Sequence, residues 1–166
     1  MAKRITTAGL LIALAMILSY LEAILPLNIG IPGVKLGLSN IVVVVSLYSL
    51  TVPETAGISL IRILLMGILF GNAVSLVYSL SGGALSLVGM IICKRLRLSV
   101  IGVSIVGAVL HNVAQLAAAV VILQSSAIGY YLPILLISGL VTGFLIGIAS
   151  DRLIFLEKKL NIQQKP

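Results

Sequence analysis

Long apolar stretches, separated only by short polar breaks, constrain this chain more than any other feature. A helix that crosses a bilayer core about 30 Å thick needs roughly 20 mostly apolar residues. Several stretches approach or exceed that length, and 60% of the 166 residues are hydrophobic while 9% are charged. A soluble domain is about 45–50% apolar and about 25% charged. The sequence therefore predicts an all-α integral membrane protein.

Six membrane-spanning helices are predicted in a single domain that covers residues 1–166. Pro53 and Glu54 divide the apolar material after residue 38 into two short spans, and the prolines and glycines between Pro26 and Gly37 predict a loop. A cleaved signal peptide is the alternative for the first span, but no small-x-small cleavage site follows it. The predicted spans are residues 7–25, 38–52, 55–71, 73–93, 99–123 and 131–150.

The positions of the basic residues predict the orientation of the six-helix bundle. Basic residues collect in the cytoplasmic loops of membrane proteins. With six spans and both termini in the cytoplasm, nine of the eleven basic residues lie on the inner side of a prokaryotic plasma membrane, which leaves Lys35 outside and Arg62 within a span. The charge thus indicates topology and contact with anionic membrane lipids, not nucleic acid. The nine are Lys3, Arg4, Lys94, Arg95, Arg97, Arg152, Lys158, Lys159 and Lys165.

The few reactive residues exclude several kinds of chemistry. The chain has one aspartate, three glutamates, one histidine and one cysteine, so it offers no disulfide and no thiolate metal cage. No GxxxxGK[ST] run is present, so ATP would have to be used by a partner. His111 and Asp151 are expected at different depths, which excludes a Ser–His–Asp site. We predict no catalytic residues, no metal and no cofactor.

Small residues recur at a spacing of four in several predicted spans. Helices in lipid associate through close backbone approach, which small side chains permit. Gly139, Gly143 and Gly147 share one face of the last span, and Gly9 and Ala13 share one face of the first. These faces serve packing within the chain, or the first one serves a separate membrane partner.

Polar residues inside the predicted spans mark a candidate binding site. An ionisable group at the centre of a membrane helix costs about 2.5–3.5 kcal/mol on insertion scales, so each needs a partner or a function. Most of these groups fall in the predicted outer half of the protein, where residues 27–37 could form a lid. The candidate substrate-binding residues are Glu22, Lys35, Asn40, Arg62, His111, Asn112 and Gln115.

A structural interpretation remains open for several of these residues. Glu22 and Arg62 could neutralise one another as an ion pair, and His111 could form a hydrogen bond between helices. Asn40 and Asn72 could cap helix ends. The gathering of these groups on one side favours a small-molecule site.

The segments LEAILP (21–26), IPGVKLGLSNIV (31–42), ISLIRILLMGILFG (58–71), SLSGGALSLVGM (79–90) and GAVLHNVAQLA (107–117) resemble the Gx transporter family, which is also labelled heptaprenyl diphosphate synthase component I. That family is similar to the substrate-binding S components of energy-coupling-factor (ECF) transporters. The resemblance implies six helices, a loop that closes over a ligand, and docking of the first helix, here through Gly9 and Ala13, on a coupling subunit driven by two ATPases.

The leading hypothesis is therefore an S component that captures a small molecule, with an anionic group or related to an isoprenoid or quinone precursor. A non-catalytic membrane component of prenyl diphosphate synthesis is the alternative. The chain cannot be the catalytic subunit of such an enzyme, because prenyl elongation needs clustered aspartates for Mg²⁺ and Asp151 is the only aspartate. An autonomous small transporter or channel is a third hypothesis.

Overall fold

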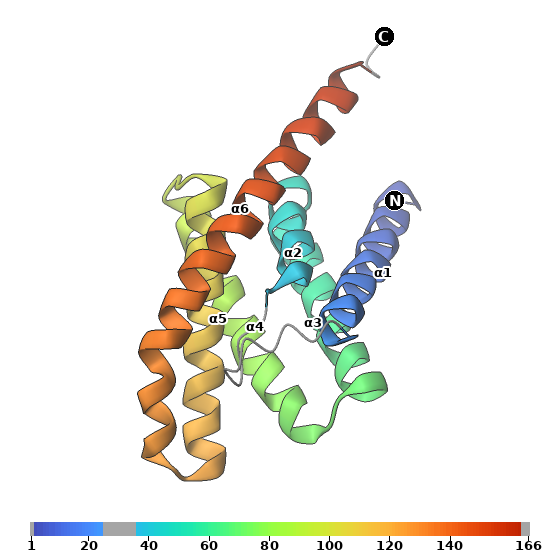
Figure 1. Cartoon of the computed structure of the whole chain (residues 1–166). Coiled ribbons are helices and arrows are strands. Elements are labelled where there is room, and N and C mark those ends of the chain that lie inside the picture. The colour runs from blue at the N-terminus through green and yellow to red at the C-terminus, as the bar shows by residue number, and fades with distance from the viewer. Residues whose placement is uncertain (1, 25–35, 164–166) are drawn as a thin grey trace.

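A computed structural model describes residues 2–24 and 36–163 of the chain. Within these residues it contains six α-helices, one 3₁₀-helix and no strand (Figure 1). The elements are α1 (Ala2–Ile24), α2 (Leu38–Ser49), α3 (Val52–Phe70), α4 (Ala73–Arg95), α5 (Val100–Leu123), η1 (Ser126–Tyr131) and α6 (Leu132–Gln163).

The prediction of an all-helical membrane protein is confirmed. Five of the helices are long and apolar enough to cross a membrane, and together they indicate a multi-pass membrane protein. Helix α2 has 12 residues, which corresponds to about 18 Å of helix and is too short to cross a bilayer core alone. The six-span count and the orientation of the termini stay predictions.

Local sequence signals explain two of the helix boundaries. Thr51 and Glu54 form a capping box at the start of α3, where Pro53 occupies the first turn. Asn72 is the N-cap of α4 and accepts a hydrogen bond from the backbone of Ser75, as the capping interpretation of Asn72 expects.

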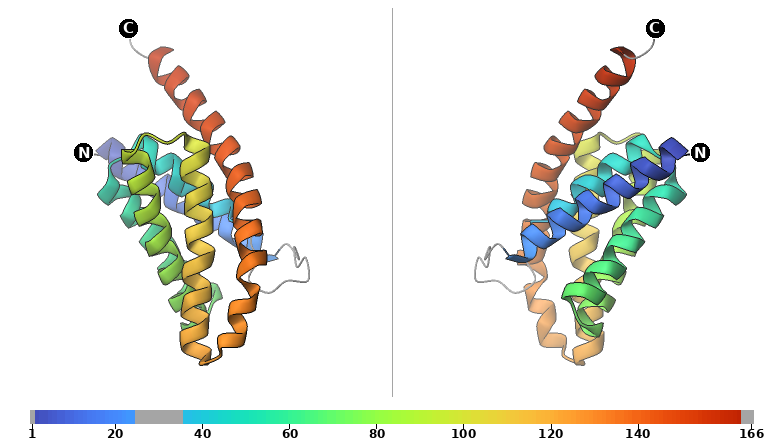
Figure 2. Two further views of the ribbon diagram at one scale, coloured as in Figure 1. Left: turned by 90° about the vertical axis from the view of Figure 1, so that its left-hand side faces the viewer. Right: turned by 90° about the vertical axis from the view of Figure 1, so that its right-hand side faces the viewer.

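Helix α6 continues well past the predicted end of the last span at residue 150. The charged residues that follow Ser150 end the apolar run but do not end the helix, because arginine, lysine and glutamate are good helix formers and no glycine or proline intervenes before Gln163. The carboxyl-terminal part of α6 consequently projects beyond the other helices (Figures 1 and 2).

Helix α2 lies at the centre of the packing. It contacts α1 and α3 on one side and α5 and α6 on the other. Val42 packs with Ala15 and Ile58, whereas Val43, Val44 and Leu47 pack with Met90 and Val103. Figures 1 and 2 show that α1 ends and α2 begins part-way along the hairpin of α5 and α6. The start of α2 therefore lies inside the length of the bundle.

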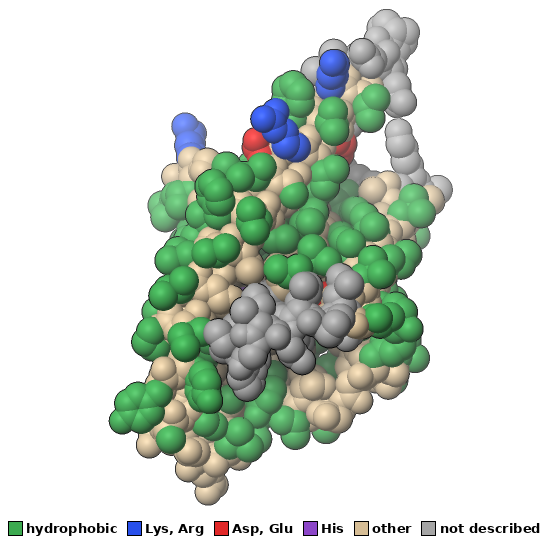
Figure 3. Space-filling model, in the orientation of Figure 1, with side chains coloured by type: hydrophobic (Ala, Val, Ile, Leu, Met, Phe, Trp, Pro, Cys, Tyr) green, Lys and Arg blue, Asp and Glu red, His purple; other side chains and the backbone are tan. Residues whose placement is uncertain are grey.

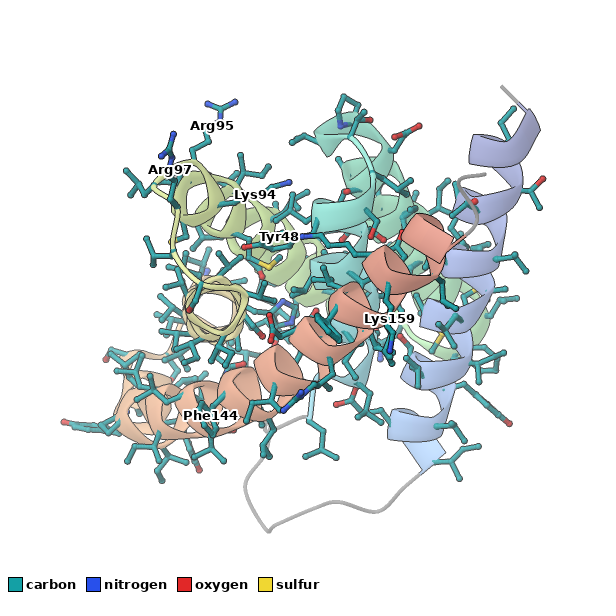
Figure 4. All side chains as sticks on the ribbon, turned by 90° about the horizontal axis from the view of Figure 1, so that it is seen from above. Tyr48, Lys94, Arg95, Arg97, Phe144 and Lys159 are labelled. Atoms are coloured by element: carbon teal, nitrogen blue, oxygen red, sulfur yellow. The ribbon has the colours of Figure 1, made fainter. Side chains whose placement is uncertain are left out.

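Basic side chains gather at the end of the molecule near the carboxyl terminus (Figure 3). Lys94 lies 5.0 Å from the centre of the Tyr48 ring and donates a hydrogen bond to the carbonyl of Leu47 at the end of α2. Arg95 and Arg97 are exposed and point outward (Figure 4). Lys94 thus holds α4 against α2, while its two neighbours remain available to lipid headgroups or to a partner.

The glycine face of α6 packs against the backbone of α5. A Cβ atom at Gly143 would lie 2.7 Å from the Cα of Ile105, and one at Gly147 would lie 2.8 Å from the Cα of Ile101. For this face the structure shows packing within the chain. The face on α1 differs, since a Cβ at Gly9 would meet nothing within 4 Å, and both Gly9 and Ala13 are exposed.

We expect Gly143→Ala to destabilise the fold by about 1–3 kcal/mol, because the added methyl group must push the α5 backbone away. Thermal unfolding of the purified protein in detergent measures the effect. Gly57→Ala in α3 is the matched control, because a Cβ there meets nothing within 4 Å. Equal loss of stability in both variants would contradict the packing assigned to Gly143.

Candidate functional site

A cavity of about 250 Å³ lies between the helices, and residues from all six α-helices line it. The end of α1 and the beginning of α2 contribute residues to its wall. Helices α3 and α5 each contribute residues from successive helical turns. Six of the seven predicted substrate-binding residues line this one cavity. They are Glu22, Asn40, Arg62, His111, Asn112 and Gln115.

The remaining predictions lie elsewhere. Lys35 lies outside the described residues, as does the expected lid apart from Leu36 and Gly37. Gly9 and Ala13 are on the exposed face of α1 and are not among the residues that line the cavity. The structure brings the six polar residues together, and their role in binding a substrate stays a prediction.

Arg62 of α3 is held by serine hydroxyl groups. Its Nη1 donates hydrogen bonds to the Oγ of Ser39 at 2.5 Å and to the Oγ of Ser19 at 3.4 Å. Its Nε is buried and has no hydrogen-bond partner among the residues that the structure describes. Two short side chains thus orient the guanidinium group and leave part of its hydrogen-bonding capacity unused.

Glu22 of α1 joins the end of α1 to the beginning of α2. Its Oε1 accepts a hydrogen bond from the backbone N–H of Gly37 at 2.5 Å. Gly37 is the N-cap of α2 and has a φ of 72°, a left-handed conformation that favours glycine. A negative charge at this position is favoured by the dipole of α2.

The expected support of Arg62 by Glu22 stays a prediction. Both residues line the cavity, but the hydrogen bonds described for Arg62 go to Ser19 and Ser39, and the one described for Glu22 comes from Gly37. Each of the two charged side chains thus bonds to the beginning of α2, Glu22 to Gly37 and Arg62 to Ser39, and Glu22 also acts electrostatically on Arg62. Asn40 belongs to the first turn of α2 and donates its backbone N–H to the carbonyl of Gly37, so it follows the cap residue and is not the cap itself.

His111 and Gln115 present one face of α5 to the cavity. A Cβ at Gly82 of α4 would lie 2.8 Å from the Cε1 of His111 and 2.9 Å from the Cγ of Gln115. The glycine thus lets α4 approach these two side chains closely. Their spacing of four residues, which places them on one helix face, was the signal in the sequence.

Asn112 has a packing contact in addition to its place on the cavity wall. Its Nδ2 donates a hydrogen bond of 2.8 Å to the carbonyl of Leu135, which ties α5 to the first turn of α6. An interhelical bond of this kind was expected as an alternative role for His111, and Asn112 forms one.

The apolar part of the cavity was not predicted. Ile63, Met66 and Phe70 of α3 and Ala108 of α5 line it, and Phe70 also contacts the ring of Tyr20 at a centroid distance of 5.0 Å. The hydroxyl groups of Ser19 and Ser39 were missed as well. Apolar residues and serines are common in membrane helices. The sequence alone therefore does not distinguish those that line a cavity from those that pack between helices.

Taken together, the side chains suit reversible binding of a small polar molecule. The wall offers a guanidinium group, a carboxylate, an imidazole and amide groups at one cavity, with an apolar surface on α3 for a hydrocarbon part. Ligand sites combine apolar walls with a few polar groups in this way.

We expect Asn112→Leu to lower the stability of the fold by about 0.6–1.7 kcal/mol, because it removes an interhelical hydrogen bond inside the bundle. Gln115→Leu is the matched comparison, since Gln115 lines the same cavity one turn later. Denaturation in mixed micelles measures the free energy of unfolding of both variants. A larger loss for Gln115→Leu than for Asn112→Leu would contradict this division between packing and cavity wall.

The comparisons with known proteins give one family. The family model described as heptaprenyl diphosphate synthase component I matches residues 11–153. The match includes every residue that lines the cavity. No curated protein and no solved structure matches the chain.

Proposed function

The chain belongs to the heptaprenyl diphosphate synthase component I family, and from this premise we propose that it is the substrate-binding membrane subunit of an ECF-like importer. The observation that carries the proposal is the single cavity in which Glu22, Arg62 and His111 meet. Ionisable groups within membrane helices are costly and mark ligand or ion pathways by default. The family itself was predicted from the sequence, and the match confirms it.

The position of α2 supports capture of a ligand within the depth of the membrane. Irregular backbone at that depth is tolerated where it is buried in protein or lines a cavity. Here the left-handed Gly37 and the first turn of α2 line the cavity. In transporters, helix ends that point into the bundle in this way form substrate sites.

In the proposed cycle the cavity takes up its ligand from the outer face of a prokaryotic plasma membrane. Residues 27–37 close over it, and movement of this subunit against its partner exposes the ligand to the cytoplasm. Binding of ATP belongs to partner ATPases, which act through a transmembrane coupling subunit. The exposed face of α1 with Gly9 and Ala13 is the proposed contact with that subunit.

A second function is favoured by the family description and by the exposed basic side chains. In this alternative the chain is a non-catalytic membrane component of prenyl diphosphate synthesis, which tethers a soluble synthase. The tether would use Arg95 at the end of α4, Arg97 just after it, and the charged end of α6, where Arg152, Lys158 and Lys159 are exposed. Co-purification from native membranes separates the two: a coupling subunit with ATPases supports the importer, and a prenyl synthase supports the tether.

We expect Arg62→Ala to weaken retention of the bound small molecule without preventing membrane insertion. The variant removes the positive charge of the guanidinium group from the cavity. The two serines that hold this group remain, but they are uncharged and cannot replace it. Mass spectrometry of small molecules retained after gentle detergent purification gives the measurement. The assigned role of Arg62 would be wrong if the variant retained the same molecule in the same amount as the parent.

We expect Gly9→Leu to reduce co-purification of the coupling subunit while the isolated chain keeps its stability. A Cβ atom at this position meets nothing within 4 Å inside the protein, so we expect the substitution to disturb an external contact rather than the fold. Leu10→Ala, at an exposed neighbour on α1, is the control for a general change in α1. Unchanged recovery of the partner in the Gly9→Leu variant would remove this face from the proposed interface.

A further inference from the structure

The cavity contains opposite charges on two different side chains, and they hold separate hydrogen-bond partners. Arg62 of α3 bonds to serine hydroxyl groups, and Glu22 of α1 bonds to the backbone of Gly37. Both line the same space. A cavity with one positive and one negative group is complementary to a ligand that carries both kinds of charge.

We infer that the ligand is a small dipolar molecule, with one anionic group that binds Arg62 and one amino group that binds Glu22. This inference rests on the proposed function of small-molecule capture and deepens it by naming the class of ligand.

Arg62 supplies the anion site. One of its terminal nitrogens is used by Ser39 and Ser19, while the buried Nε has no partner among the described residues. A buried donor without a partner is costly, and a charged one more so. A carboxylate is an acceptor of the geometry that guanidinium groups bind, so an anionic ligand group at Arg62 would satisfy the unused donor.

Glu22 restricts the total charge of the ligand. One of its carboxylate oxygens accepts the Gly37 N–H, and the carboxylate remains on the cavity wall. A ligand with only negative charge would place a like charge near Glu22, and a diphosphate would place several. An amino group on the ligand turns this repulsion into attraction. Among the described residues, the charges on the wall therefore disfavour prenyl diphosphates and favour a molecule without net charge.

The cavity volume indicates a small ligand. Its 250 Å³ is below the roughly 300–1,000 Å³ of sites for drug-sized ligands. Met66 and Phe70 provide an apolar part of the wall for a single ring or a short chain of the ligand.

The test uses three probes built on the same benzene ring: 4-(aminomethyl)benzoate, which is dipolar, 4-methylbenzoate, which is anionic, and 4-methylbenzylamine, which is cationic. Isothermal titration measures their binding to the purified full chain in detergent. We expect the dipolar probe to bind about tenfold more tightly than either singly charged probe.

Two variants assign the charges to the residues. Arg62→Gln is expected to weaken binding of the dipolar probe by about tenfold or more. Glu22→Gln is expected to weaken binding of the dipolar probe and to strengthen binding of 4-methylbenzoate. The amide oxygen of the glutamine still accepts the Gly37 N–H, while the repulsive negative charge is gone. Arg95→Gln, at the exposed far end of α4, is the matched control and should leave the binding of all three probes unchanged. Thermal unfolding of each variant confirms its fold.

The identity of the molecule retained by the parent protein provides the second measurement. A retained molecule with both an amino and an anionic group supports the inference. A parent that prefers 4-methylbenzoate, or that retains a purely anionic molecule, overturns the dipolar class but leaves the capture function standing. A parent that binds none of the three probes and retains no small molecule overturns both.

Discussion

The backbone at the start of α2 imposes the constraint on which the site depends. A helix leaves its first N–H groups without partners inside the helix, and a lipid environment offers none. Helix α2 begins part-way along the bundle, so its first turn must be satisfied by protein (Figures 1 and 2). Glu22 accepts the N–H of Gly37, and the left-handed conformation of Gly37 turns the chain into the helix. Glu22 and Arg62 both bond to residues at this helix start, and both line the cavity.

The rest of the fold holds this helix start in place. The apolar side chains of α2 enter two hydrophobic clusters, one with α1 and α3 and one with α4 and α5. At the opposite end, Lys94 binds the last turn of α2 through the carbonyl of Leu47. The close contact of Gly143 with the α5 backbone makes the α5–α6 pair a tightly packed wall. The cavity thus lies between a wall of closely packed helices and the ends of α1 and α2, where Glu22 accepts the N–H of Gly37.

The sequence predicted the polar part of this site because polar groups in apolar helices are rare. Arg62 and Glu22 stand out by charge, and His111 and Gln115 by their spacing on one helix face. The pairing of Glu22 with Gly37 could not be predicted, since it depends on how α1 and α2 meet in space. Ser19 and Ser39 were missed because serine is common in membrane helices, and Phe70 because an apolar residue is expected everywhere. The continuation of α6 was missed because a change in polarity marks the end of a span but not the end of a helix.

The two functional interpretations of this family place their demands on separate parts of the molecule. Capture of a ligand depends on Arg62, Glu22 and the first turn of α2, whereas a tether for a soluble enzyme depends on the exposed arginines at the end of α4 and on the projecting end of α6. Helix α4 contributes to both, but through opposite ends: Ser75 and Ser79 line the cavity, and Arg95 is its last residue. A tether does not require a guanidinium group inside the bundle whose Nε, among the described residues, has no hydrogen-bond partner, and such a group is costly to bury. The retention of Arg62 inside the bundle is therefore the physical reason to prefer ligand capture.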